Sequence, residues 1–363
     1  MRLIVDVGHP GHVHLFKNAM RILKERGHEI FVVVRERENA VKPLLEHLNI
    51  DHIELYPNAK GIVPKAITML KNDLKLLKIT KKINPDILLS MTSPYSAQVS
   101  KIINKPHITF ADTEDAKLIL KLTEPFTDAF ITEEYLRYKF PKNKHISLPT
   151  WRPLAYLHPK YFEPDKKVLD YLNIDYGDKF FIVRFSAWDA SHDWKLNLDI
   201  SWDERMKFVK NLSKHGYVFI SSEEKVIGKI PYGKPLKIPP YMFHDALAFS
   251  SGYFGEGHMS AREAVCLGIP TILISPRAKL ESVIVHLSDK GFLKIFNSYK
   301  ELNNENIMDL MSSKKDVIKN EIKNLVDLTE FFVYFIESYP SSRDEYIKNK
   351  DKLIEKFKFG TEG

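Results

Sequence analysis

The chain has 363 residues, of which 44% are hydrophobic and 28% are charged. That length suffices for two domains of ordinary size, each with its own apolar core. We find neither a secretory leader nor an uncharged apolar run of about 18 residues, so no membrane-spanning helix is expected. The single cysteine, Cys266, excludes a disulfide framework, and we expect a cytoplasmic protein.

Basic residues outnumber acidic ones by 54 to 47, which gives a formal net charge of +7. This mild excess is compatible with nucleotide ligands, an anionic lipid surface or nucleic acid, and it selects none of them. The chain shows no zinc-finger spacing, RNA-binding sheet motif or long basic run, so we expect no nucleic-acid partner. Oligomeric state does not follow from the sequence.

The chain opens with a β-α-β unit, in which the strands Leu3–Val7 and Glu29–Val34 flank an amphipathic helix, Leu15–Glu25. The turn before the helix contains two glycines and three histidines: Gly8, His9, Gly11, His12 and His14. The histidines do not share a helical face and have no acidic or cysteine ligand nearby, so we expect no metal site and no other cofactor. Two interpretations stay open, contact with an acceptor or phosphate and simple loop packing.

A long helix is predicted from Pro64 to Ile83. It has an apolar stripe formed by Ile67, Leu70, Leu74 and Leu77. A row of lysines runs beside this stripe, formed by Lys71, Lys75, Lys78 and Lys82. The pattern fits a sheet-covering helix with a solvated lysine face. It also fits an interfacial helix that brings the protein to an anionic membrane as a peripheral partner.

Two acids, Asp112 and Glu114, follow the predicted strand Lys105–Phe110. In an open α/β sheet, functional groups gather at the carboxyl ends of strands, so both acids are placed where a general base is needed. The alternative is that they cap the next helix. We predict Thr127–Thr132 as the last strand of this half, before a proline-rich connector with the domain boundary near residue 155.

The second half restarts with the buried strand Phe180–Phe185 and a loop that contains Ser186 and His192, two side chains able to contact a ligand. Farther on, Gly255 and Gly257 form a glycine-rich turn into a helix that Ser260 is predicted to cap. The strand Thr271–Ser275 then follows, and its continuous apolar run indicates burial on both faces.

Such a turn suits an anion, because the first amides of a helix point outward and the helix dipole is positive there. A phosphate is favoured against Gly257, His258, Met259 and Ser260. Glu263 lies one turn farther, where a carboxylate accepts hydrogen bonds from vicinal hydroxyls such as those of a ribose. A plain structural turn remains the alternative reading.

The segment resembles the donor-site signature of GT-B glycosyltransferases and of non-hydrolysing UDP-N-acetylglucosamine 2-epimerases. The matching positions are Gly255, Gly257, Glu263-Ala264 and Gly268-Ile269-Pro270. The resemblance implies that Glu263 holds a uridine ribose and that Gly257 to Ser260 face the pyrophosphate, although His258-Met259 stands where small residues are usual. The turn containing Gly8, Gly11 and His12 resembles the glycine-rich loop of the lipid II-forming glycosyltransferase. Overall, the chain is similar to an uncharacterised prokaryotic family of unknown function.

The resemblance implies an α/β, GT-B-like fold of two doubly wound Rossmann-type domains facing a central cleft. Residues 1–155 would form the acceptor side, residues 156–340 the nucleotide-sugar side, and residues 341–363 a helix packing back on the first domain. The implied reaction is sugar transfer from a nucleotide sugar, UDP-linked, with Asp112 or His12 removing the acceptor proton and Glu114 and His192 as further catalytic candidates.

Two other functions stay open. One is sugar-nucleotide 2-epimerisation, against which the acid-free loop Ser90–Ser93 argues. The other is a non-catalytic nucleotide-binding or scaffold protein. The base, the sugar and the acceptor are not determined by the sequence.

Overall fold

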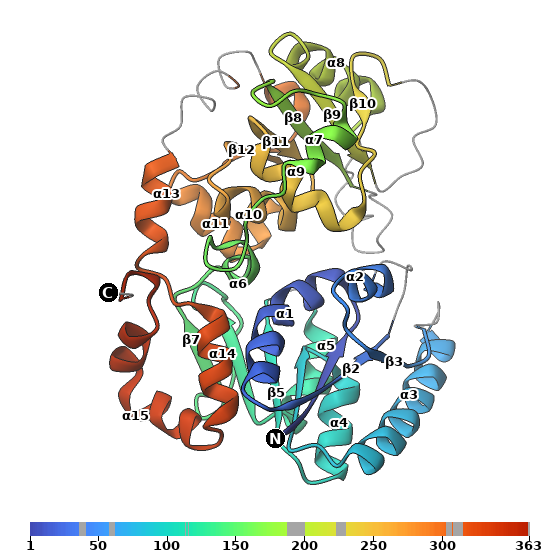
Figure 1. The fold of residues 1–363 in the computed structure, drawn as a ribbon, viewed down its shortest axis with the longest axis vertical. Coiled ribbons are helices and arrows are strands. Elements are labelled where there is room, and N and C mark those ends of the chain that lie inside the picture. Colours follow the sequence, from blue (N-terminus) through green and yellow to red (C-terminus); the bar gives the residue numbers. More distant parts are fainter. Residues whose placement is uncertain are drawn as a thin grey trace. The chain divides into compact units, whose positions relative to one another are not determined.

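The computed structural model describes residues 1–35, 41–57, 62–112, 114, 116–186, 200–222, 230–302, 307 and 315–361. These residues form two compact units (Figure 1). The first comprises Met1–Tyr156 and Lys323–Gly363, and the second comprises Leu157–Ile322. Each is built on one parallel sheet with helices between its strands.

The first unit has a seven-stranded sheet in the order β3-β2-β1-β4-β5-β6-β7, with all neighbours parallel. Its strands are β1 (Arg2–Val7), β2 (Glu29–Val34), β3 (His52–Glu54), β4 (Ile87–Met91), β5 (His107–Ala111), β6 (Ala129–Glu133) and β7 (His145–Leu148). Because the chain proceeds outward in one direction from β1 and in the other from β4, the sheet is doubly wound.

The helices of this unit cover both faces of the sheet. They are α1 (Pro10–Glu25), α2 (Val41–His47), α3 (Ile62–Ile83), α4 (Pro94–Ile102), α5 (Lys117–Thr123), η1 (Glu124–Phe126), α14 (Leu328–Glu337), α15 (Ser341–Lys356) and η6 (Phe359–Thr361), while α6 (Leu154–Leu157) leads into the second unit. The connections β1-α1-β2 and β3-α3-β4 cross the sheet in opposite directions, so their right-handed crossovers put α1 and α3 on opposite faces. Leu76 of α3 packs there against Ile4 and Leu88.

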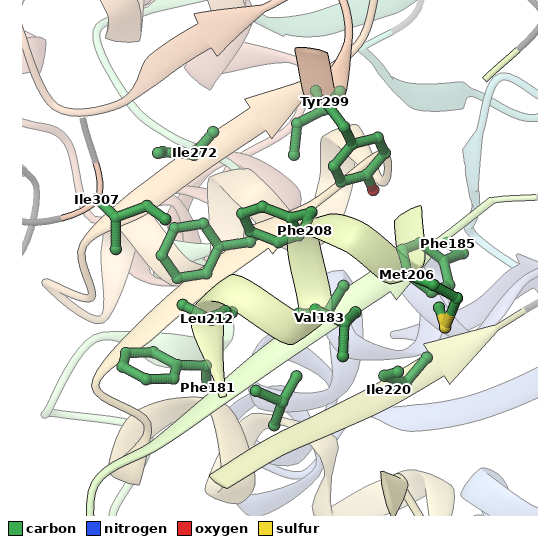
Figure 2. Packing of buried hydrophobic residues seen from close by; sticks show 14 residues of the cluster. Phe181, Val183, Phe185, Met206, Phe208, Leu212, Ile220, Ile272, Tyr299 and Ile307 are labelled. Atoms are coloured by element: carbon green, nitrogen blue, oxygen red, sulfur yellow. The ribbon is translucent and has the colours of Figure 1, made fainter. Parts of the chain in front are cut away.

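The second unit has a six-stranded parallel sheet in the order β10-β9-β8-β11-β12-β13. Its elements are α7 (Lys167–Leu172), β8 (Phe180–Phe185), α8 (Trp202–Leu212), β9 (Tyr217–Ser222), β10 (Lys234–Pro235), η3 (Pro240–Met242), α9 (Phe243–Phe249), β11 (Gly252–Gly255), α10 (His258–Cys266), β12 (Thr271–Ile274), η4 (Ala278–Leu280), α11 (Ser282–Asp289), β13 (Lys294–Phe296), η5 (Tyr299–Glu301) and α13 (Lys315–Ile322). Figure 2 shows the core between α8 and this sheet, where Phe208 of α8 packs with Phe181, Phe185 and Tyr299. This aromatic layer holds β8 and α8 as one rigid body.

The predicted pair of doubly wound α/β sheets is confirmed, and β2 and β8 have the predicted bounds. Three local predictions were wrong. Thr127–Thr132 is not the last strand of the first half, because the short strand β7 follows between two prolines. The segment Glu321–Tyr339, whose apolar pattern predicts one helix, instead contains the end of α13 and all of α14, since Asp327 caps a new helix start by accepting bonds from the amides of Thr329 and Glu330. The signature helix α10 is capped by Gly257 rather than Ser260.

The C-terminal segment packs within the first unit. Phe332 of α14 lies 5.5 Å from the ring of Phe16 in α1 and 6.1 Å from that of Phe110 in β5. The hydroxyl of Tyr346 in α15 donates to the carbonyl of Ser147 in β7 and accepts from its amide. Residues 323–340 thus lie with the first compact unit, whereas the sequence interpretation grouped them with residues 156–322.

In the parts of the chain that the structure describes, no helix combines the length and apolar character needed to cross a bilayer.

Candidate functional site

The N-terminus of α10 follows directly from the carboxyl end of β11, at the centre of the second sheet. The first hydrogen bond of the helical ladder runs from the amide of Ala261 to the carbonyl of Gly257, at 3.0 Å. The amides of His258, Met259 and Ser260 therefore precede that ladder, as the first amides of any helix do. No acidic residue lies in this first turn, so the positive end of the helix dipole is not neutralised by the helix itself.

Both glycines of the turn are required by close approach to Arg184 in β8. A Cβ atom at Gly255 would lie 2.7 Å from the carbonyl oxygen of Arg184, and one at Gly257 would lie 2.9 Å from its Cδ. The arginine side chain thus runs beside the start of α10, with Nη1 donating to Ser221 Oγ at 3.1 Å. Arg184 adds positive charge next to the helix terminus, which favours an anion there.

Glu256, the residue between the two glycines, stabilises the turn through the hydrogen bonds of its side chain. Its buried carboxylate accepts two bonds from Arg205, each 2.8 Å long, and a third from the hydroxyl of Tyr299 at 3.0 Å. The amide of Ser186 donates to the same carboxylate at 3.0 Å. Ser186 and the α10 turn, two predicted donor-binding elements, are thereby attached to one buried anchor.

Glu263, the predicted ribose ligand, is buried on α10, and its carboxylate lies 3.1 Å from Nε2 of His244 in α9. The ring of His244 in turn meets Phe162 at a centroid distance of 6.4 Å. This pair restricts the rotamers of the carboxylate. The sequence did not indicate His244, because nothing in the residues around it distinguishes it from a helix-packing histidine.

His258 has both ring nitrogens engaged within the second unit. Nε2 lies 2.7 Å from Ser275 Oγ, and Nδ1 lies 2.6 Å from Glu281. The ring therefore ties α10 to the segment after β12, and the contribution of His258 to an anion site would come from its backbone amide. Met259 is half-buried beside it, and Ser260 is buried within the first turn.

In the first unit, the turn Gly8–His12 forms the start of α1. His9 caps this helix by accepting the amide of Gly11 at 3.0 Å, and His12 Nδ1 accepts the amide of Gly8 at 3.3 Å. A backbone amide only donates, so Nδ1 of His12 is unprotonated and the proton of the neutral ring is on Nε2. Burial, assisted by His9 and Arg152 and opposed by Asp112, lowers the pKa of His12 to about 3. His12 thus suits hydrogen-bond donation better than proton removal.

Arg152, which the sequence analysis did not identify, brings the other candidates of this unit together. Its guanidinium forms an ion pair with Asp112 and lies 3.3 Å from the position of a Cβ at Gly11. Its backbone amide donates to the buried Glu133 at 2.7 Å. Asp112, Gly11 and His12 are therefore gathered at the N-terminus of α1.

The other two predicted catalytic residues are Glu114 and His192. Glu114 accepts the amide of Arg137 at 2.6 Å, a bond to the segment that follows β6. His192 lies outside the described residues. Among the described residues, no group of three or more His, Cys, Asp or Glu side chains has metal-binding geometry, and His14 stacks on Tyr156 at 5.2 Å instead.

A buried ion pair supports the turn after β1. Asp6 accepts bonds from Arg35 and from the hydroxyls of Ser93 and Ser96. Burial by itself would raise the pKa of the Asp6 carboxyl, but Arg35 and the two hydroxyls outweigh it and hold that pKa below its usual value. The network joins β1 to α4 at the topological switch point between β1 and β4. Arg35, a member of the network, also lies next to Gly8.

Solved structures share this architecture over nearly the whole chain. UDP-GlcNAc 2-epimerase from Methanocaldococcus jannaschii is 13% identical, with 93% of this chain and 99% of that chain covered and a TM-score of 0.68. MnaA from S. aureus, solved with UDP, is 12% identical, with 94% and 97% covered and a TM-score of 0.64. The glycosyltransferase VinC, in complex with DTDP, is 11% identical, with 95% and 100% covered and a TM-score of 0.62.

Identities this low establish the fold alone, and the two sheets with their interleaved helices are a GT-B fold. The chain itself belongs to the family described as protein of unknown function (DUF354), whose model matches residues 1–340. The predicted resemblance to this family and to the two GT-B groups is confirmed. No curated protein matches the chain in sequence.

Proposed function

We propose that this protein binds a nucleoside diphosphate sugar in its second unit and transfers the sugar to an acceptor. The observation that carries the proposal is the start of α10, where a glycine turn, the adjacent Arg184 and the carboxylate of Glu263 lie within about two helical turns of each other. A diphosphate and a ribose diol need these groups in this order. Two GT-B neighbours were solved with nucleoside diphosphates, which supports the same ligand class here.

The roles in the second unit follow from charge and geometry. The amides from His258 to Ser260 and the Arg184 guanidinium would stabilise the diphosphate as it leaves, without a metal ion. Glu263, oriented by His244, would accept bonds from the ribose hydroxyls. Ser186 would lie near the same ligand, because its amide donates to Glu256 in the α10 turn.

The first unit would supply the acceptor chemistry. Asp112 is the carboxylate we assign as general base, and Arg152 orients it. His12 would donate from Nε2 to the acceptor or to a sugar oxygen. Gly8 and Gly11 let Arg35, His9 and Arg152 approach the backbone of this turn, since a Cβ at Gly11 would lie 3.1 Å from His9 and 3.3 Å from Arg152.

Sugar-nucleotide 2-epimerisation is the second candidate, and one observation favours it. Arg152 contacts two carboxylates, since its guanidinium pairs with Asp112 and its backbone amide donates to Glu133, and proton removal and return would require two such acids. The two reactions separate in D₂O. An epimerase incorporates deuterium at the sugar C2 without any acceptor, whereas a transferase releases nucleotide only when an acceptor is present.

The direct test is calorimetric titration of the purified protein with UDP, dTDP, GDP and their sugar conjugates, repeated with Glu263→Gln. We expect uridine nucleotides to bind the wild type, and the variant to lose roughly tenfold in affinity because one diol contact is weakened. Asp289→Asn, an exposed acid in α11 of the same unit, is the matched control and should bind as wild type. If no nucleotide binds, the proposal fails, and a scaffold function takes its place.

A further inference from the structure

The outer face of α3 carries a row of large aliphatic side chains. Ile67, Leu70 and Leu74 are 50%, 62% and 61% exposed, whereas Leu76 on the sheet-facing side is fully buried. The three residues follow one another at spacings of three and four, so they are neighbours on one side of the helix. Single exposed aliphatics are ordinary, but a row of three on one helix marks a contact surface.

Lysines border this row. From Ile67 to Ile83 the helix carries five lysines and only one acid, Asp73. At about 100° per residue, Lys71, Lys75, Lys78 and Lys82 fall on the strip beside the aliphatic row. The outer face of α3 is therefore apolar along one side and positive along the other.

Tyr56 extends this face from the segment before the helix. The side chain of Asn72, fully buried on α3, accepts the amide of Tyr56 at 2.8 Å and donates to its carbonyl at 3.0 Å. The Tyr56 ring is 47% exposed and lies 4.6 Å from the Lys75 ammonium. A tyrosine anchored beside a lysine suits the boundary between lipid tails and headgroups.

We propose that the outer face of α3, defined by Tyr56, Ile67, Leu70, Leu74 and the adjoining lysines, docks on an anionic lipid bilayer. The helix would lie in the plane of the membrane surface, with its aliphatic row at the acyl boundary and its lysines on the phosphates. The charge selects this occupant, because a row of lysines beside exposed aliphatics complements an anionic surface and would repel a second copy of the same face. The inference does not depend on the proposed function.

The test is co-sedimentation of the full chain with phosphatidylcholine vesicles, with and without phosphatidylserine. We expect binding to the anionic vesicles, loss of that binding in roughly 1 M salt, and little binding to phosphatidylcholine alone. Lys71→Gln with Lys78→Gln should weaken binding by about 25-fold, at roughly fivefold per lysine. Leu70→Ser with Leu74→Ser should weaken it by about 100-fold while leaving the salt dependence unchanged.

A matched control lies on α15, where Ile347 is 50% exposed and neighbours Lys348 and Lys350 among acids. Ile347→Ser with Lys348→Gln and Lys350→Gln should bind vesicles as wild type. Thermal midpoints of all variants should stay close to wild type, because every substituted side chain is on the surface. The proposal is overturned if wild type ignores phosphatidylserine, if the α15 variant loses as much binding as the α3 variants, or if sedimentation velocity shows a dimer that Leu70→Ser with Leu74→Ser converts to monomer without any vesicle binding.

Discussion

The starts of α1 and α10 follow the same plan but differ in what they offer a ligand. Both helices begin directly after a buried parallel strand, and neither has an acid in its first turn. At α10 the proposed ligand would meet mainly backbone amides, in a turn that contains two glycines and is held by the buried Glu256–Arg205 pair. At the start of α1, polar side chains lie beside the helix terminus, namely His12 and the Asp112–Arg152 pair. In the proposed function, the second unit would bind the nucleotide and the first would supply the proton chemistry.

Replacement of Asp112 should have the largest effect on turnover. Asp112→Asn removes the proposed base and should lower kcat by about 10²- to 10⁴-fold with the affinity for the nucleotide unchanged. Glu114→Gln is the matched control, because Glu114 accepts the amide of Arg137 in the segment after β6, and the variant should retain most activity. Initial rates of nucleotide release measure both. Equal losses of activity in the two variants would contradict the assignment of Asp112 rather than Glu114 as the general base.

Removal of Arg205 should have the largest effect on stability. Arg205→Met leaves Glu256 buried without its ionic partner, so the free energy of unfolding should fall by about 3–5 kcal/mol. Adding Glu256→Gln should restore part of that loss, since a neutral amide is cheaper to bury. Urea denaturation of Arg205→Met, Glu256→Gln and the double variant gives the free energies for a double-mutant cycle. If the double variant is no more stable than Arg205→Met, charge burial is not the cause.

Acid should weaken the first unit through His12. Its folded-state pKa of about 3 lies below the usual 6.5, so the unfolded chain binds the proton more readily. The resulting stability is present above pH 6.5 and is lost as pH falls toward 3, at up to about 1.4 kcal/mol per pH unit. Between roughly pH 7 and pH 5, where this loss of stability begins, the urea midpoint should fall less steeply with pH in His12→Asn than in the wild type. Parallel curves would show that His12 is not the titrating group.

The smallest contrast should come from the two glycines nearest the helix starts. Gly257→Ala puts a methyl group 2.9 Å from Arg184 Cδ and should reduce nucleotide affinity by about tenfold. Gly11→Ala meets His9 and Arg152 at the looser distances of 3.1 and 3.3 Å, so its effect on nucleotide affinity should be negligible. Titration with the same nucleotide measures both. A larger loss from Gly11→Ala would reverse the division of roles between the units.

Local patterns predicted most of the fold and one side of the candidate site. Strands such as β2 and β8 are mainly apolar, with Glu29 and Arg184 as their charged residues. Glycine stands at positions 255 and 257, where a Cβ atom would lie 2.7 Å and 2.9 Å from atoms of Arg184. The sequence did not predict the break between α13 and α14. Asp327 ends the apolar pattern only where its side chain accepts the amides of Thr329 and Glu330, and this contact is visible only in the structure. β7 was missed because a four-residue strand between prolines has almost no periodic signal.

The sequence by itself determined the two β-α repeats, the glycine turn and the position of Glu263 on its helix, because these depend on residues close together in the chain. Only the tertiary structure decided which groups meet them, since Arg152 lies 40 residues from Asp112 and Arg205 lies 51 residues from Glu256. It also decided which side of α3 faces outward. That helix has apolar residues on two sides, and the choice depends on which of them fits the sheet: Leu76 packs there, and Leu70 and Leu74 are left at the surface.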